Sequence, residues 1–418
     1  MRSGCVSHGV VSSAPQSPNA PRRGALVFIF VTLLLDSLAL GVSVPVFPKL
    51  VLAFQGGDTA GAATAFGAFG TVFALMQLVC APLLGALSDR FGRRPVILLS
   101  IFGLGFDYVL MALAPSLGWL FVGRVVSGIC ASNFSTAGAY IADVTPPEKR
   151  AASFGMLGAA FGVGFTLGPA VGGLLGSVSL RLPFWVAAGL TLANAVYGLA
   201  ILPESLPRER RVPFRWRAAN PLGSLALLRS IPVVFGLAGV VFLHRLAHDV
   251  QPSMFVLYTG YRYGWDERTV GFVLMAVGVL GALLSAGAVG PVVKRIGERH
   301  ALLLGLASGA LGFSAYGLAA SGVAFLTFLP VVALWGGFTG PSLQALLTRN
   351  VDPSEQGRLQ GALASLGSVA SVIAPGLFTG VFAAAVRGAA PPTLPGAPFL
   401  LAGALLALAF ALAWRVAR

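Results

Sequence analysis

Three aspartates stand inside long apolar stretches of the chain, where a charged side chain is costly. Asp36, Asp107 and Asp249 each lie in a run long enough to form a membrane-spanning helix. A carboxylate at the centre of such a helix costs about 2.5 to 3.5 kcal/mol on insertion scales. A carboxyl group in low-dielectric surroundings can load and unload a proton near neutral pH. A structural ion pair is the alternative, and we expect Asp36 and Asp107 to form a proton relay.

Arg124 is the one basic residue within the apolar stretches of the first half of the chain. The small residues that follow it would let a neighbouring helix or a ligand approach closely: Ser127, Gly128, Ala131 and Ser132. A guanidinium group close to a carboxylate stabilises its ionised form. We therefore expect Arg124 to offset one of the aspartates and to take part in proton coupling.

Four polar residues cluster near the centre of the apolar stretch at residues 231–257. In one helix His244 and His248 would share a face, as would Arg245 and Asp249. The histidines could bind a metal, although two ligands are too few, or line a cavity beside an Arg245–Asp249 ion pair. They could also couple protons, because imidazole titrates near neutral pH. We keep His244, His248 and Asp249 as candidate proton-coupling residues and expect no bound metal.

The elements that position these side chains are twelve apolar stretches, each long enough to cross a bilayer as a helix. Hydrophobic residues make up 56% of the 418 residues and charged residues only 10%, which is typical of a membrane protein. The stretches lie at residues 25–45, 65–86, 95–114, 118–141, 151–176, 183–202, 231–257, 269–291, 301–320, 323–347, 358–385 and 396–414. The predicted fold class is an all-α membrane protein with twelve transmembrane helices.

Three pairs of landmarks recur in the two halves of the chain at spacings of 205 to 207 residues. They are Gly85–Arg94 with Gly290–Arg299, Val144–Glu148 with Val351–Glu355, and Pro169 with Pro375. Such a repeat predicts two pseudo-symmetric bundles of six helices each, and secondary transporters of this design bind their substrate between the halves. The predicted units are a disordered tail at 1–24, bundles at 25–202 and 231–418, and a cytoplasmic linker at 203–230.

The distribution of basic residues predicts the orientation. Placing the N-terminus in the cytoplasm puts most of the 28 lysines and arginines on the cytoplasmic side, as membrane proteins prefer. Both termini are then cytoplasmic, and the expected location is the inner membrane of a bacterium. This topology accounts for the net charge of +14, so no nucleic-acid partner is expected.

Several enzyme motifs are missing from the sequence. None of the three lysines follows a glycine as a P-loop requires, and there is no G-x-S-x-G elbow or zinc-protease helix. We expect a transporter and not an enzyme, although an intramembrane enzyme stays open. The expected energy source is the proton gradient, without a cofactor. The expected partners are a small-molecule substrate, protons and the lipid bilayer, and we expect a monomer.

The segment Gly85–Pro95, Gly-Ala-Leu-Ser-Asp-Arg-Phe-Gly-Arg-Arg-Pro, resembles the loop signature of the major facilitator superfamily. The resemblance implies a gate at the cytoplasmic side, in which charged residues of the loop pair with helix ends. The residues it assigns to this gate are Gly85, Asp89, Arg90, Gly92, Arg93 and Arg94.

Glycines recur at every fourth position in the fifth apolar stretch, as in helix faces that pack backbone against backbone. This stretch also resembles the antiporter motif of the superfamily, which favours export over uptake. The residues concerned are Gly164, Gly168, Pro169, Gly172 and Gly173.

Further motifs are similar to the tetracycline/proton antiporter family. They are Asp36 to Gly41 with Pro45 and Pro48, Met76-Gln77, Phe106-Asp107-Tyr108, Gly123-Arg124, Arg262 to Trp265 and Leu343-Gln344. The resemblance implies proton coupling by Asp36, Asp107 and Arg124. The substrate contacts that we expect with it are Gln77, Asn133, Phe134 and Gln344.

The chain departs from well-known members of this family at several positions. Glycines, Gly281 and Gly309, stand where those members have a histidine and an acid, and the stretch at 231–257 is more charged here. Either proton coupling has moved to that stretch or the substrate is not tetracycline. A nutrient or metabolite symporter or uniporter, and a transporter-like membrane sensor, are the alternatives to export.

Overall fold

The computed structural model describes residues 23–131, 134–214, 232–388 and 394–417, and the described residues contain helices and no strands. The helices of the first half are α1 (Arg23–Ser43), α2 (Phe47–Phe54), α3 (Thr59–Phe91), α4 (Arg93–Leu113), α5 (Leu117–Cys130), α6 (Phe134–Val144), α7 (Arg150–Gly176) and α8 (Leu182–Ile201). Those of the second half are α9 (Pro232–His248), α10 (Val250–Tyr263), α11 (Glu267–Leu283), α12 (Val289–Leu318), α13 (Gly322–Thr327), α14 (Leu329–Arg349), α15 (Gln356–Val386) and α16 (Ala397–Val416). The prediction of an all-α protein is confirmed.

The helices agree with twelve membrane spans. Within the described residues, nine segments are long and apolar enough to cross a membrane. One of them, Glu267–Leu318, is 52 residues long and contains two predicted spans, in α11 and α12. The predicted spans at 118–141 and 231–257 are each divided between two shorter helices, α5 with α6 and α9 with α10.

Two glycines show that the repeat extends to the backbone. Gly92, between α3 and α4, has φ +107° and ψ 157°, and Gly297, 205 residues later, has φ +80° and ψ 160°. Residues other than glycine rarely adopt a φ in this range. Each glycine therefore allows the same sharp turn at the same point of its half.

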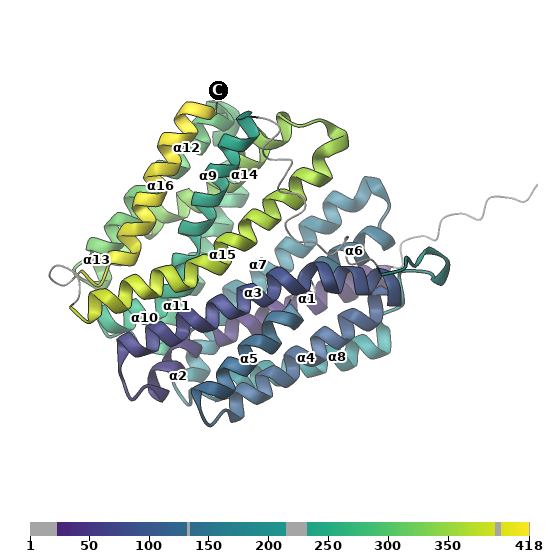
Figure 1. The fold of residues 1–418 in the computed structure, drawn as a ribbon, viewed down its shortest axis with the longest axis horizontal. Helices are drawn as coiled ribbons and strands as arrows, with labels where there is room; N and C mark the ends of the chain where they lie inside the picture. The colour runs from purple at the N-terminus through teal and green to yellow at the C-terminus, as the bar shows by residue number, and fades with distance from the viewer. Residues whose placement is uncertain (1–22, 132–133, 215–231, 389–393, 418) are drawn as a thin grey trace, which may run out of the picture.

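Figure 1 shows two groups of helices, formed by the two halves of the chain. The groups contact each other through α3 with α15 and through α7 with α11. Two bonds cap helices of this interface, since Asp58 accepts a hydrogen bond from the Ala60 N–H and Asp266 accepts one from the Thr269 N–H. The hydrogen bonds from Thr269 hold the pKa of Asp266, in a loop outside the spans, below its ordinary value.

The glycines of α7 bring its backbone into direct contact with neighbouring helices on two sides. A Cβ atom on Gly168 would lie 2.7 Å from the Gly41 Cα of α1. A Cβ atom on Gly173 would lie 2.4 Å from the Glu267 carbonyl oxygen of α11. Side chains at these positions would force the helices apart, so α7 holds α1 on one side and the other half of the molecule on another.

Candidate functional site

Asp107 is the most deeply buried acid in the described part of the first half. Its side chain, on α4, is completely buried, and neither carboxylate oxygen has a hydrogen-bond partner in the described structure. The nearest positive charge is Arg124 of α5, whose Nη2 lies 3.9 Å from Asp107 Oδ2. The Ser127 hydroxyl below it donates instead to the Gly123 carbonyl oxygen, at 2.9 Å. Because a buried charge needs a partner, an ionised Asp107 depends on Arg124.

Arg124 is near both of the predicted relay acids. Its guanidinium stands 4.5 Å from the centre of the Phe47 ring and 5.4 Å from that of Phe73, which stabilises a cation. Together with Asp36 it lines a cavity of about 40 Å³. The expectation that Arg124 offsets an aspartate agrees with its ion pair with Asp107.

Asp36 has a partner that the sequence analysis missed. The side-chain amide of Asn194, on α8, donates to Asp36 Oδ1 at 3.0 Å and to the Thr32 carbonyl oxygen at 3.2 Å. Asn194 is completely buried. A buried amide in an apolar stretch needs hydrogen bonds, and this was the signal in the sequence that could have found it.

In the second half, the seventh predicted span is interrupted at Asp249, between α9 and α10. Asp249 Oδ1 lies 3.0 Å from His248 Nδ1, and the Ser371 hydroxyl of α15 donates to Asp249 Oδ2 at 2.6 Å. Among the ion pairs of the described residues, none joins Arg245 to Asp249. The expected Arg245–Asp249 pair is therefore wrong. The contact with Ser371 was not predicted, because the two residues are far apart in the sequence.

The two histidines pack against one aromatic side chain. The rings of His244 and His248 lie 5.1 Å and 5.7 Å from the ring of Trp335, on α14. Within the described residues, no three side chains of His, Cys, Asp or Glu converge as metal ligands would. Ring contacts with Trp335 thus hold both histidines within the second half.

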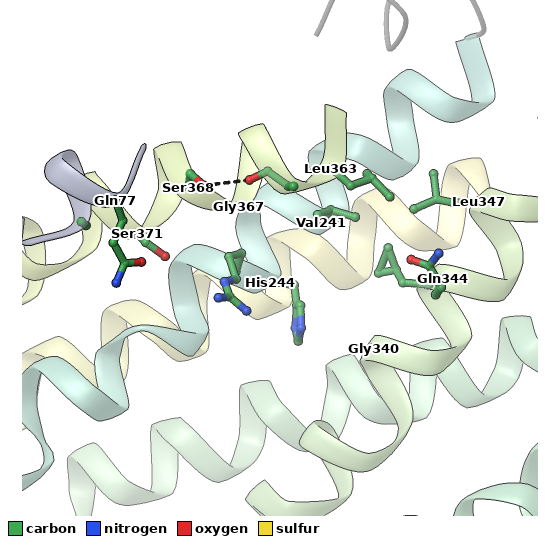
Figure 2. Close-up of a pocket in the computed structure, with 14 residues that line it drawn as sticks. Gln77, Val241, His244, Gly340, Gln344, Leu347, Leu363, Gly367, Ser368 and Ser371 are labelled. Atoms are coloured by element: carbon green, nitrogen blue, oxygen red, sulfur yellow. Dashed lines mark hydrogen bonds between the residues drawn. The ribbon is translucent and has the colours of Figure 1, made fainter. Parts of the chain in front are cut away.

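A cavity of about 520 Å³ is lined by α3, α9, α14 and α15 (Figure 2). Gln77 and Gln344, two of the predicted substrate contacts, are in its wall together with His244 and Arg245. Asn133 lies outside the described residues, as does the side chain of Phe134, the first residue of α6. The structure thus brings together two of the four predicted contacts, from different halves of the chain.

A second cavity, of about 360 Å³, lies between the halves and is mostly apolar. Its polar members are Ser43 and Arg124 from the first half and His248 and Gln251 from the second. Its aromatic lining was not predicted and comes from both halves: Phe47, Phe66, Phe73, Phe165 and Phe255. Cavities of this kind, mainly apolar with few polar groups, are typical of small-molecule sites.

The two halves are joined at one end of the molecule, which we call the closed end. There Lys49 of α2 forms an ion pair with Glu267 of α11 at 3.2 Å and donates to the Trp265 carbonyl oxygen at 2.8 Å. Figure 1 shows α2 and α10 close together at this end and the two groups of helices separating toward α6 and the C-terminus. We call that opposite end the open end.

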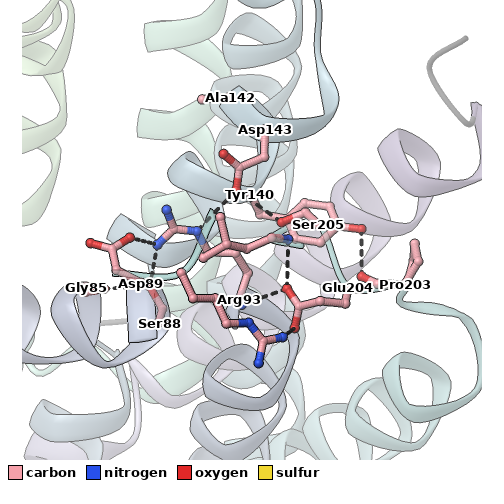
Figure 3. Close-up of polar contacts among 12 residues, drawn as sticks. Gly85, Ser88, Asp89, Arg93, Tyr140, Ala142, Asp143, Pro203, Glu204 and Ser205 are labelled. Carbon is pink, nitrogen blue, oxygen red and sulfur yellow. Dashed lines mark hydrogen bonds and ion pairs between the residues drawn. The ribbon is translucent and has the colours of Figure 1, made fainter. Parts of the chain in front are cut away.

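The signature loop lies at the open end, where Arg93 is its centre (Figure 3). The Arg93 guanidinium contacts Asp89 at 2.6 Å and Asp143, in the last turn of α6, at 3.2 Å. The Arg93 N–H donates to Glu204 at 2.9 Å. The loop therefore pairs with a helix end, and Asp89, Asp143 and Glu204 all belong to the first half.

The remaining loop residues surround this centre. The Gly85 carbonyl oxygen accepts a bond from the Ser88 hydroxyl, Arg90 lies over the Phe91 ring, and Arg94 donates to the Leu199 carbonyl oxygen. Gly92 supplies the turn. The loop is a structured connection between α3, α4 and α8.

Comparison with known proteins identifies the family. The model of the Major Facilitator Superfamily matches residues 29–375 and again residues 237–418. This chain belongs to the major facilitator superfamily. Members of the superfamily are transporters, and this one is a membrane transporter of small molecules and not an enzyme.

Relatives and solved structures of the superfamily agree with this assignment. The chain is 42% identical over 363 residues to the tetracycline resistance protein, class C, of Escherichia coli, covering 87% of this chain and 90% of that one. It is 26% identical to the human organic anion transporter MFSD10, with a TM-score of 0.68 over 94% of this chain and all of that one. An inward-facing bacterial homologue of the lysosomal transporter Spinster has a TM-score of 0.75 at 15% identity, covering 96% of this chain and 97% of that one, which shows the shared fold.

Proposed function

We propose that this transporter exports tetracycline from the bacterial cytoplasm in exchange for protons. The observation that carries the proposal is the 42% identity, along almost the whole chain, to a tetracycline resistance protein. The cluster of Asp36, Asp107 and Arg124 supports the proton-coupled part, because it places two acids and one shared cation in the interior of one half.

In the proposed cycle, the open end faces the cytoplasm. The basic residues concentrated in the loops at that end support this orientation, with both termini inside. The cavity that contains Gln77 and Gln344 then receives the substrate from the cytoplasmic side. Release outside requires that the Lys49–Glu267 contact break and that the open end close.

Proton coupling follows from the dependence of Asp107 on Arg124. While Asp107 is ionised, Arg124 must stay near it, because the carboxylate has no hydrogen-bond donor in the described structure. When Asp107 takes up a proton, this attraction ends. Arg124 is then free to interact with Asp36 or with a substrate in the aromatic cavity that it also lines. The ionised Asp107 carboxylate, Asp36 and a substrate thus compete for one cation.

The proposal includes a monomer that acts in the bacterial cytoplasmic membrane with protons as its energy source. The alternative, uptake by a symporter or uniporter of the same fold, makes a different prediction in inverted membrane vesicles. Tetracycline added to energised vesicles should cause proton efflux and accumulate inside if the protein is an antiporter. Vesicles without the protein are the control.

A panel of minimum inhibitory concentrations in an efflux-deficient host tests the substrate. Expression of the chain should raise the value for tetracycline and not for unrelated antibiotics. If another compound causes proton efflux from the vesicles and tetracycline has no effect, the protein is still an antiporter but tetracycline is not its substrate.

A further inference from the structure

One charged side chain in the membrane interior has no role in the proposed relay. Arg245 lies on α9 within the seventh predicted span, and its side chain is exposed to the 520 Å³ cavity. In the described part of the chain, its guanidinium makes no hydrogen bond or ion pair. An intramembrane arginine is costly, and one without a protein partner indicates a ligand.

The surroundings of Arg245 leave the guanidinium directed to the cavity. Its aliphatic part passes Gly367 of α15, where a Cβ atom would lie 3.8 Å from Arg245 Cγ. The acid closest in sequence, Asp249, is already held by His248 and Ser371. Arg245 attracts that carboxylate by its charge without direct contact, so its guanidinium donors stay available to the cavity.

The cavity wall carries positive charge and hydrogen-bond donors, and no acid. None of the 14 lining residues is an aspartate or glutamate. His244 is its other titratable group. The side-chain amides of Gln77 and Gln344 also line the cavity, and no described hydrogen bond occupies them. The cavity thus favours an anionic group over a cationic one.

We propose that Arg245 is a substrate-binding residue that recognises an oxyanion, with the Gln77 and Gln344 amides as additional donors. A guanidinium presents a planar fork that matches two neighbouring oxygen atoms of an ionised enol or carboxylate. The inference rests on the proposed function and adds to it the charge of the substrate group that the second half binds. For tetracycline, that group is the ionised oxygens of its acidic tricarbonyl ring.

Binding to the purified full-length protein tests the inference without requiring a proton gradient. The probes are tetracycline and 4-dedimethylaminotetracycline, which keeps the acidic oxygens and lacks the ammonium group. The variants Arg245→Gln and Arg245→Met remove the charge in two ways, so a folding defect in one does not decide the result. Arg262→Gln is the matched control, because it removes an exposed arginine in the last turn of α10, outside this cavity.

We expect both charge-removing variants to raise the Kd of both compounds at least about tenfold, as for loss of a charge-assisted contact. Arg245→Lys should restore part of the affinity, and Arg262→Gln should bind like the wild type. Unchanged affinity in Arg245→Gln or Arg245→Met would overturn the inference, and so would a loss confined to tetracycline itself. If the wild type binds neither compound, the proposed tetracycline specificity fails and the inference fails with it.

Discussion

The buried acids of the two halves have opposite surroundings. Asp107 of the first half has no hydrogen-bond donor in the described structure and one arginine at 3.9 Å. Asp249 of the second half is bound by His248 and by Ser371, both at hydrogen-bond distance. A carboxylate bound by two donors depends less on a neighbouring arginine than Asp107 depends on Arg124. The difference indicates a switching role for Asp107 and a structural one for Asp249.

The arginines differ in the same way. Arg124 is enclosed by Phe47, Phe73 and Asp107, whereas Arg245 reaches a cavity without an ionic partner in the described structure. In the first half, the positive charge of Arg124 is thus balanced by Asp107. In the second half, the positive charge of Arg245 is available to a substrate.

At the open end, the two halves repeat one ion pair with reversed signs. Arg93 pairs with Asp143 in the first half, and Glu298 pairs with Arg349 at the equivalent positions, 205 and 206 residues later. The backbone turn beside each pair is the same, at Gly92 and Gly297. Both halves therefore have an ion pair at this position, with the acid and the arginine exchanged.

The largest expected effect comes from the two acids of the proposed relay in the first half. Asp107→Asn and Asp36→Asn should each abolish uphill export while leaving expression intact, because an amide keeps the shape of the side chain and cannot carry a proton. Tetracycline accumulation in inverted vesicles with an imposed pH gradient measures this. Wild-type accumulation in either variant would remove that aspartate from the relay.

A second prediction tests whether Asp249 is structural. Asp249→Ala should lower the stability by about 1 to 3 kcal/mol, because His248 and Ser371 lose their acceptor. Asp249→Asn should lose less, since an amide keeps one acceptor oxygen.

Thermal unfolding of the purified protein measures both variants of Asp249. Adding Arg245→Gln to either variant should not restore stability. A rescue would show that Arg245 and Asp249 interact after all, and would return Asp249 to the candidate proton carriers.

A third prediction concerns the histidines that lie beside Asp249. The double variant His244→Ala, His248→Ala should weaken tetracycline binding, because both rings are packed on Trp335 in the cavity walls. The dependence of binding on pH near about pH 6 to 7, where free imidazole titrates, should stay unchanged.

Binding measured from pH 5.5 to 8 with and without a chelator separates the three roles of the histidines. Loss of the pH dependence would place proton coupling in the second half and contradict the contrast between the halves. An effect of the chelator on the wild type that equals that of the double variant would indicate a metal.

The smallest effect is expected at the signature loop. Asp89→Asn should lower turnover about two- to fivefold with unchanged affinity, since an ion pair at the surface contributes up to about 1 kcal/mol. Asp89 is 48% exposed, which limits the strength of its contact with Arg93. Transport and binding assays on the same preparation separate the two parameters.

Lys294→Gln, at the equivalent position 205 residues later, is the matched control. Lys294 forms no ion pair among the described residues, so its removal should change turnover less than Asp89→Asn. A large loss of affinity in Asp89→Asn would argue for a role of the loop in substrate recognition.

The sequence by itself determined the membrane fold, the repeat and the polar residues worth examining. Whether a segment can cross a bilayer depends on its own length and apolarity, and repeated landmarks are visible without coordinates. The closeness of Arg124 to an aspartate was also predicted, because a single cation buried among acids has few alternatives. These properties are local or follow from composition.

Only the tertiary structure decided which partners the buried groups have. Asn194 is 158 residues from Asp36, and Ser371 is 122 residues from Asp249, so no local pattern pairs them. The predicted Arg245–Asp249 contact rested on the spacing of four residues along a helix. The backbone keeps that spacing, since the Asp249 N–H donates to the Arg245 carbonyl oxygen at 3.3 Å, but the Asp249 carboxylate is bound by His248 and by Ser371 of α15. Helix ends and the rotation of packed helices determine which face of each span meets which neighbour, and these depend on contacts along the whole chain.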